Sequence, residues 1–296
     1  MRPLLCLLLA MTAFAADQTV GRSFLMLGGL TQIVDATGKV AWKYPAATRD
    51  GYVLPNGNLL LTLSKNKAYP GGAVVEVTRD QKVVWEYKGQ QSEVNTAIQL
   101  DNGNVMLTEA GDKPRLLEIA RDGSTKVEIP LGCQIKNHHM QSRMARKLAD
   151  GHYLVPQDKT VREYDAAGKV VWERKSPDST SDNRSFCCLR NAAGHTLISL
   201  TVGNHIIEVD EAGKIVWELR DGDLPGVPVN RTTALSWLPN GNIVFSNYAA
   251  RTPQAKLVEI TREKKVVWTY TDASNQGVHE FQLLDTEGKP TPGVLR

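Results

Sequence analysis

The sequence has no long hydrophobic run after its first residues and no excess of charge of either sign. Its most apolar stretch, Leu4 to Phe14, is too short to span a bilayer, and no later segment is long and apolar enough. Lys and Arg number 35 against 32 Asp and Glu, which gives a net charge of +3. We therefore predict no membrane span and no nucleic-acid partner.

Metal-binding motifs are missing as well. The sequence contains no His-x-His, no Cys-x-x-Cys and no acidic cluster beside its one histidine pair, so we predict no metal site. Only four cysteines are present. Three of them, Cys133, Cys187 and Cys188, follow the apolar start, an odd number that predicts one free thiol or an unusual pairing.

The first residues have the pattern of a leader. Arg2 supplies a positive charge before the apolar stretch, and Ala13-Phe14-Ala15 matches a small-x-small cleavage site. A membrane anchor is the alternative interpretation of this segment. We predict a signal peptide over residues 1–15, a mature domain over 16–296, and a secreted or periplasmic location.

One phrase recurs along the chain: apolar-Glu-apolar, then Asp or Thr, a turn, and Lys-Val-Val-Trp. The Trp position is filled by Trp42, Trp85, Ile129, Trp172, Trp217 and Trp268. The spacing of about 43 to 51 residues is the period of a four-stranded propeller blade. We expect these tryptophans to pack between neighbouring blades, because a structural role is the simplest explanation of a tryptophan in nearly every outer strand.

A second phrase, of the kind Leu-Pro-Asn-Gly-Asn, alternates with the first. Asn-Gly and Asp-Gly between apolar runs are strong signals for tight hairpins. Each unit therefore contains two hairpins, one between its first and second strands and one between its third and fourth. In two of the latter turns Gln81 and Lys264 replace the expected Gly, so either the turn type changes or a side chain adopts left-handed geometry.

The two ends of the mature chain complement each other. The segment from Ser23 to Tyr44 supplies outer strands without a preceding hairpin, and His279 to Leu295 supplies a hairpin without outer strands. Together they complete a sixth blade, which also removes exposed sheet edges. We predict an all-β, six-bladed β-propeller, a single domain closed by pairing of its N- and C-terminal strands.

The repeated phrases resemble those of quinoprotein-like propellers and, equally, the propeller of bacterial arylsulfate sulfotransferases. The resemblance covers nearly all of the mature chain and is specific for the fold rather than the activity. Quinoproteins have larger propellers and a ring of cofactor contacts that we do not find in this sequence. The sulfotransferases use a histidine that takes up the sulfuryl group, assisted by further His, Asn and Arg residues, but no motif fixes which histidine here would match.

The short hairpins fall on one face of the disc and the longer, irregular connections on the other. A rigid scaffold with variable loops on one side commonly binds ligands there. Candidate binding residues lie just before the inner strands: Arg49, Asn95, Arg143, Arg184, Arg231 and His279. Converging cations favour a sulfate, phosphate or carboxylate group, although solvated loop residues are the simpler interpretation of each one alone.

The pair His138-His139 is the candidate for catalysis. One of the two could act as a nucleophile or general acid–base group, and only one would face the channel if the pair lies on a strand. The alternative is a loop histidine with a structural partner. His152 and His195 fall in the repeated turns of the opposite face, so we expect them to be surface residues.

The cysteines leave three arrangements open. A disulfide bond from Cys133 to Cys187 or Cys188 would join adjacent blades. A bond between neighbouring Cys187 and Cys188 would match quinoproteins, in which such a bond lies beside the cofactor. The third arrangement is a pair of small, buried, inert residues.

These observations favour a monomeric binding or scaffold protein that presents a site for a small anionic ligand or another protein, with no cofactor identified. The alternatives are sulfuryl transfer through His138 or His139 and quinone (PQQ)-dependent oxidation. A calcium-dependent propeller hydrolase is disfavoured, because the expected channel positions are basic and lack carboxylates.

Overall fold

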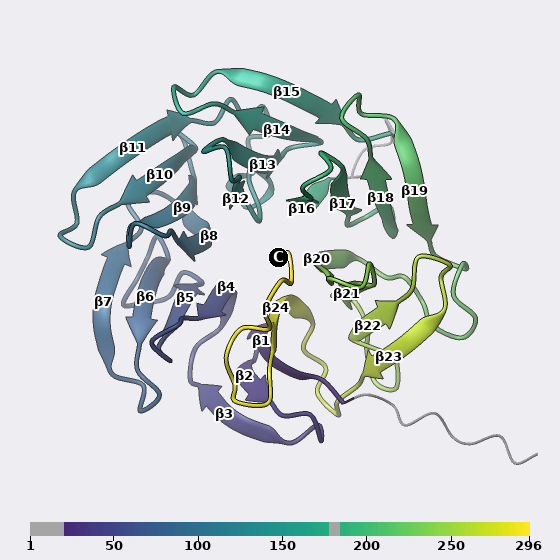
Figure 1. Ribbon diagram of the computed structural model, residues 1–296. Helices are drawn as coiled ribbons and strands as arrows, with labels where there is room; N and C mark the ends of the chain where they lie inside the picture. The colour runs from purple at the N-terminus through teal and green to yellow at the C-terminus, as the bar shows by residue number, and fades with distance from the viewer. Residues whose placement is uncertain (1–20, 178–183) are drawn as a thin grey trace, which may run out of the picture.

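Six four-stranded antiparallel sheets surround a central axis, as Figure 1 shows. The structure is a computed structural model that describes residues 21–177 and 184–296. The predicted signal peptide over residues 1–15 lies outside these ranges. Within them, no helix has the length and apolar character needed to cross a membrane.

Each sheet is a blade whose strands follow one another outward from the axis. From innermost to outermost, the first two sheets are β4 (Thr48–Val53), β5 (Leu59–Leu63), β6 (Ala73–Val77) and β7 (Val83–Lys88), then β8 (Glu93–Gln99), β9 (Val105–Ala110), β10 (Arg115–Ile119) and β11 (Thr125–Pro130). The next two are β12 (Arg146–Lys147), β13 (Tyr153–Gln157), β14 (Thr160–Tyr164) and β15 (Val170–Lys175), then β16 (Ser185–Arg190), β17 (Thr196–Leu200), β18 (His205–Val209) and β19 (Ile215–Arg220). The last two are β20 (Thr232–Trp237), β21 (Ile243–Asn247), β22 (Leu257–Ile260) and β23 (Val266–Tyr270), then β24 (Val278–Leu284), β1 (Ser23–Gly28), β2 (Thr31–Val34) and β3 (Val40–Tyr44).

The two ends of the chain share the sixth sheet, which confirms the predicted closure. β24 pairs with β1 in an antiparallel register that sets Phe24 opposite Leu283 and Met26 opposite Phe281. The strand count at each end differs from the prediction, because the C-terminus supplies only the innermost strand and the N-terminus supplies the other three. β1 already occupies the second position, so residues 289–296 turn inward and end at the centre of the ring in Figure 1.

Both exceptional turns keep the geometry of the others. Gln81 and Lys264 have φ of 69° and 62°, the left-handed conformation that costs a side chain roughly 1 kcal/mol. Each gains a contact in return. Gln81 donates its amide to the Lys43 carbonyl at 2.9 Å, and the Lys264 ammonium lies 2.7 Å from Asp223.

The repeated tryptophans join each blade to the next, as predicted. Four of them donate the indole N–H to a backbone carbonyl in the third-to-fourth-strand turn of the following blade, at 2.8–3.1 Å. The pairs are Trp42 with Arg79, Trp85 with Arg121, Trp172 with Glu211 and Trp217 with Arg262. At the closing joint Trp268 instead packs edge-on against Phe24, with ring centroids 5.8 Å apart.

The repeated glutamates form a second joint that the sequence analysis did not assign. Each lies buried on the third strand of a blade and pairs with a cation of the next blade. The pairs are Glu76 with Arg121, Glu118 with Lys147, Glu163 with Arg190, Glu208 with Arg262 and, across the closing joint, Glu259 with Arg22. His152 and His195 are partly exposed on the hairpin face, as predicted, and they also take part in the joint, because their Nδ1 atoms lie 2.6 and 2.7 Å from Glu163 and Glu208.

A buried layer of charged side chains lies near the axis, next to the residues that begin the inner strands. Asp50 and Glu280, both fully buried, lie between Arg146 and Arg296 at N–O distances of 3.2–3.7 Å. The Arg296 guanidinium also lies over the Tyr52 ring, 4.0 Å from its centroid. Burial raises the pKa of Glu280 to about 7, because the attraction of Arg296 and Arg146 is partly cancelled by the charge of Asp50.

The three cysteines of the described chain are free thiols, so neither predicted bridge forms. Cys187 and Cys188 are neighbours on β16, and their side chains point to opposite faces of the strand, into two different hydrophobic clusters. Cys133 packs in a third cluster. Burial raises the pKa of Cys133 and Cys187 to about 12, which makes the thiols inert.

We predict that removal of residues 278–296 abolishes cooperative thermal unfolding, because the inner edge of β1 loses its partner. Removal of residues 289–296 alone keeps β24 and serves as the control. It should lower the midpoint by on the order of 10 °C, because Asp50 and Glu280 lose Arg296, and breaking a buried ion pair costs about 3–5 kcal/mol. Calorimetric melting measures both; an unchanged midpoint after the larger deletion would contradict closure by β24.

Candidate functional site

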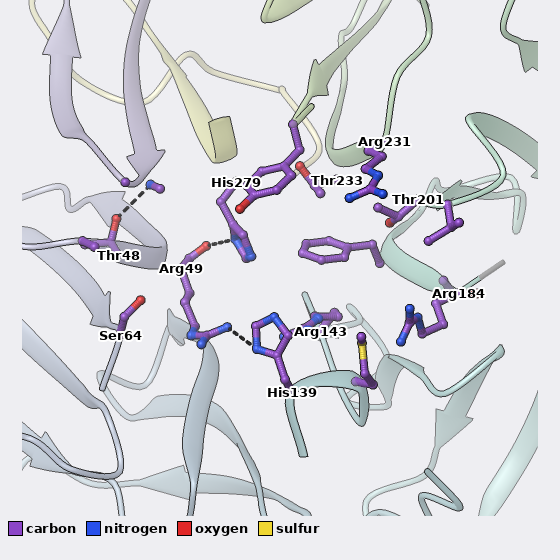
Figure 2. Close-up of a pocket in the computed structure, with 18 residues that line it drawn as sticks. Thr48, Arg49, Ser64, His139, Arg143, Arg184, Thr201, Arg231, Thr233 and His279 are labelled. Carbon is purple, nitrogen blue, oxygen red and sulfur yellow. Dashed lines mark hydrogen bonds between the residues drawn. The ribbon is translucent and has the colours of Figure 1, made fainter. Parts of the chain in front are cut away.

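A cavity of about 310 Å³ opens on the face that carries the irregular connections. Of the predicted binding residues, the structure brings Arg49, Arg143, Arg184, Arg231 and His279 into its lining, together with His139 (Figure 2). Asn95 lies just outside the lining. The residues come from the start of inner strands or the loops before them in different blades, so the closed ring itself assembles the cavity.

Arg143 forms the floor. Only 6% of the residue is exposed, its Nη1 donates to Asn95 Oδ1 at 3.2 Å, and the guanidinium carbon lies 5.2 Å from the centroid of the Phe186 ring. Burial and the charge of Arg49 lower the pKa of Arg143 to about 9, against the attraction of Glu93. The side chain therefore remains a cation at neutral pH, and no carboxylate of the described residues forms an ion pair with it.

Arg49 is already neutralised. Its Nη2 lies 3.2 Å from Glu93 Oε1, and Glu93 Oε2 lies 3.1 Å from Nδ1 of His139. Burial opposes ionisation of Glu93, but the hydrogen bond with His139 and the charges of Arg49, His139 and Arg143 outweigh it and lower the pKa of this carboxyl to about 2. Sequence reasoning missed Glu93, because a single Glu at the start of a strand has no distinguishing pattern.

Arg184 and Arg231 approach the cavity from the opposite side, near Thr201 (Figure 2). Arg231 has a φ of 50°, and its backbone N–H donates to Asn204 Oδ1 at 2.8 Å. Its guanidinium makes no hydrogen bond or ion pair with any residue of the described ranges. The hydroxyl of Thr201 is buried and equally without a partner there. This side of the cavity therefore presents donors that a bound anion could satisfy.

His279 is fixed on three sides. Its Nδ1 lies 2.7 Å from the backbone carbonyl of Arg49, so this nitrogen carries the proton and donates it. The rings of Phe186 and Tyr248 pack edge-on against the imidazole, with centroids at 4.9 and 6.0 Å. Burial and the charges of Arg143 and Arg49 lower the pKa of His279 to about 3, so the ring is neutral and its Nε2 is an acceptor.

The two candidate catalytic histidines lie on a short 3-10 turn, η1 (His138–Met140), rather than on a strand. Asn137 begins the turn by accepting the backbone N–H of His139. His139 lines the cavity, whereas His138 lies outside it, with its Nε2 3.2 Å from Asp112. The expectation that the two side chains point in opposite directions applied to a strand and does not apply to this turn. Only one histidine of the pair faces the cavity, as expected.

Asp150, His152 and Glu163 gather on the hairpin face with ligand atoms within 4.8 Å of one another. Their proximity has a direct explanation. His152 is hydrogen-bonded to Glu163, and the other oxygen of Glu163 pairs with Arg190. We assign this group to the joint between blades.

The cavity does not fit the quinone cofactor of the proteins that the sequence resembles. The bonded cysteine pair that the resemblance implies beside that cofactor is not formed by Cys187 and Cys188. The 18 lining residues all belong to the described ranges, and neither cysteine is among them. None of these 18 residues carries a carboxylate. We therefore derive no quinone chemistry for this site.

We predict that Glu93→Gln lowers stability at neutral pH by about 3 kcal/mol, which is the free energy of a pKa held about 2.5 below its ordinary value of 4.5. A lowered carboxyl pKa stabilises the fold above the ordinary value, and this contribution is lost as the pH falls from about 4.5 to 2. Urea unfolding across pH measures the effect. The curves of the two proteins should converge in acid; parallel curves would contradict the assignment.

Comparison with proteins of known structure supports the fold. A structure of unknown function from Bacteroides caccae is 23% identical, covers 88% of this chain and 98% of its own, and superposes with a TM-score of 0.75. Virginiamycin B lyase from Staphylococcus aureus is 16% identical over 90% of this chain and 92% of its own, with a TM-score of 0.61. A periplasmic gluconolactonase from Pseudomonas aeruginosa is 10% identical over 90% of each chain, with a TM-score of 0.60.

At these identities the solved structures establish the fold alone. No curated protein matches the chain. The repeats, in contrast, match a family of PQQ-type propeller repeats described as outer membrane protein assembly factor BamB. The two matches, over residues 28–190 and 132–292, together cover nearly the whole propeller. The chain belongs to this PQQ-repeat β-propeller family.

Proposed function

We propose that this protein binds a small organic anion in the cavity at the loop end of its channel. One observation carries the proposal: arginines from four different blades converge on one cavity, and none of its lining residues in the described chain is acidic. Glu93 lies behind the lining and offsets Arg49. Arg143 and Arg231 remain without a carboxylate partner among the described residues, so an anion would satisfy them.

The size and walls of the cavity favour an organic anion over an inorganic ion. Its volume, about 310 Å³, lies at the lower end of ligand pockets, which begin near 300 Å³. Phe186, Met140, Val202 and Tyr248 line it alongside the arginines. Such apolar walls would contact the body of a ligand whose charged group lies on the arginines.

A second candidate is sulfuryl transfer, the activity that the sequence resemblance implies. It is favoured by His139 and His279, two imidazoles that line the same cavity as the arginines. Binding is the better-supported function, because Nδ1 of His139 is engaged with Glu93, and because burial and the charges of Arg143 and Arg49 lower the pKa of His279 to about 3, which makes its imidazole a weak base.

We also propose that the protein acts outside the cytoplasm, because residues 1–15 have the pattern of a signal peptide. Cell fractionation followed by N-terminal sequencing tests this proposal: the secreted or periplasmic fraction should contain a chain that begins after residue 15.

We predict that Arg143→Met and Arg231→Met each weaken the binding of phenylacetate by about 10- to 100-fold. A charge-assisted hydrogen bond contributes roughly 1.5–3 kcal/mol, and the methionine keeps an apolar stem in place. Isothermal titration calorimetry with phenylacetate and with sulfate measures the effect. Arg174→Met, on the outer strand β15, is the matched control and should bind as the wild type does.

Equal affinities in the wild type and both cavity variants would contradict the proposed site. Incubation with para-nitrophenyl sulfate and a phenol acceptor is run in parallel. Release of para-nitrophenol that depends on His139 or His279 would favour sulfuryl transfer over simple binding.

A further inference from the structure

The arginines and His279 of the cavity differ in whether they donate or accept hydrogen bonds. The arginines offer only donors, because a guanidinium has five N–H groups and no acceptor. His279 differs, because its Nδ1–H is committed to the Arg49 carbonyl and Nε2 therefore carries a lone pair. Nε2 makes no hydrogen bond within the described part of the chain, while the residue lines the cavity. A ligand that satisfies this lining must present acceptors to the arginines and a donor to His279.

Contacts with neighbouring side chains fix the orientation of the His279 imidazole. Phe186 lies between two side chains of the site, with the Arg143 guanidinium over its ring and the His279 ring against its edge. The Tyr248 ring makes a second edge-on contact with the imidazole. These contacts hold Nε2 in one direction before any ligand arrives, which lowers the entropic cost of forming a hydrogen bond there.

The charge of the cavity decides what kind of donor can approach. An ammonium group would be a donor, but the guanidinium of Arg143 has no carboxylate partner among the described residues, and its charge is the main cause, after burial, of the lowered pKa of the His279 ring. A cationic donor would be repelled by the same guanidinium. A hydroxyl donates a hydrogen bond without bringing positive charge, so it fits both requirements.

We propose that the ligand is a hydroxy acid: its oxyanion contacts Arg143 and Arg231, its apolar body lies against Phe186, and its hydroxyl donates to Nε2 of His279. This inference rests on the proposed function and adds the chemical class of the ligand. It also gives His279 the role of a specificity-determining residue. The deoxy analogue would cover Nε2 without donating a hydrogen bond to it, so it should bind more weakly.

The test compares acids that differ in one group, by isothermal titration calorimetry with the full mature chain. Mandelate carries a hydroxyl where phenylacetate carries hydrogen, and phenylglycine carries an ammonium at the same position. The hydroxybenzoate isomers and benzoate form a second series with a different hydroxyl placement. In at least one series the wild type should bind the hydroxy acid roughly 10-fold or more tightly than its deoxy partner, and phenylglycine more weakly than phenylacetate.

In His279→Leu the preference for the hydroxyl should disappear, so that each hydroxy acid and its partner bind within about twofold. His279→Gln keeps an amide oxygen as acceptor and should retain part of the preference, which covers the case in which the leucine variant fails to fold. The control is His195→Asn, a substitution that other blades carry naturally at the same turn position, as Asn58 and Asn242 show. It should leave the preference unchanged.

The outcomes separate this inference from the function on which it rests. Equal wild-type affinities within both series, with binding still weakened by Arg143→Met and Arg231→Met, would overturn the hydroxy-acid inference and leave anion binding in place. A preference that survives His279→Leu would overturn the role of His279. Absence of binding by every acid would overturn both proposals.

Discussion

The pairing of β24 with β1 is the constraint on which the rest of the structure depends. It places β24 beside β4, and the Nδ1 atom of His279 reaches the Arg49 carbonyl only because these inner strands are neighbours. The same closure brings Glu280 beside Asp50 in the charged layer below. A propeller opened at this pairing would lose both the cavity and the charged layer, since no single blade contains either.

Two of the joints between neighbouring blades combine three contacts of one arginine. Arg121 accepts the indole N–H of Trp85 with its backbone carbonyl, stacks its guanidinium over the same ring and pairs with Glu76 of the same preceding blade. Arg262 does the same with Trp217 and Glu208. Burial of a carboxylate costs free energy unless the carboxylate is paired with a cation. Each glutamate is paired only when the next blade is correctly positioned, so the pair favours the correct packing of the two blades. This rigid rim allows the loops of the other face to vary without loss of the ring.

The fold could be read from the sequence because its signals are local and repeated. A turn that needs positive φ favours Gly, Asn or Asp, and a position filled by tryptophan, or once by Ile129, recurs every 43 to 51 residues and marks each blade. The site follows a different rule, since its contacts join residues far apart. His279 was found by its position before an inner strand, but its tautomer depends on a carbonyl 230 residues away. Glu93 and the 3-10 turn at His138 had no repeated signal, and only the assembled ring shows that Glu93 takes Arg49 out of use for an anion.

The charged layer at the axis also governs how a ligand can exchange. Asp50 and Glu280 directly follow Arg49 and His279 along their strands, and both pair with Arg146 and Arg296 in the buried layer. We therefore expect this layer to close the channel below the cavity, so that a molecule leaves by the mouth through which it entered. Entry and exit share one barrier, so residence time is set by the loops at that mouth and by the arginines just inside it.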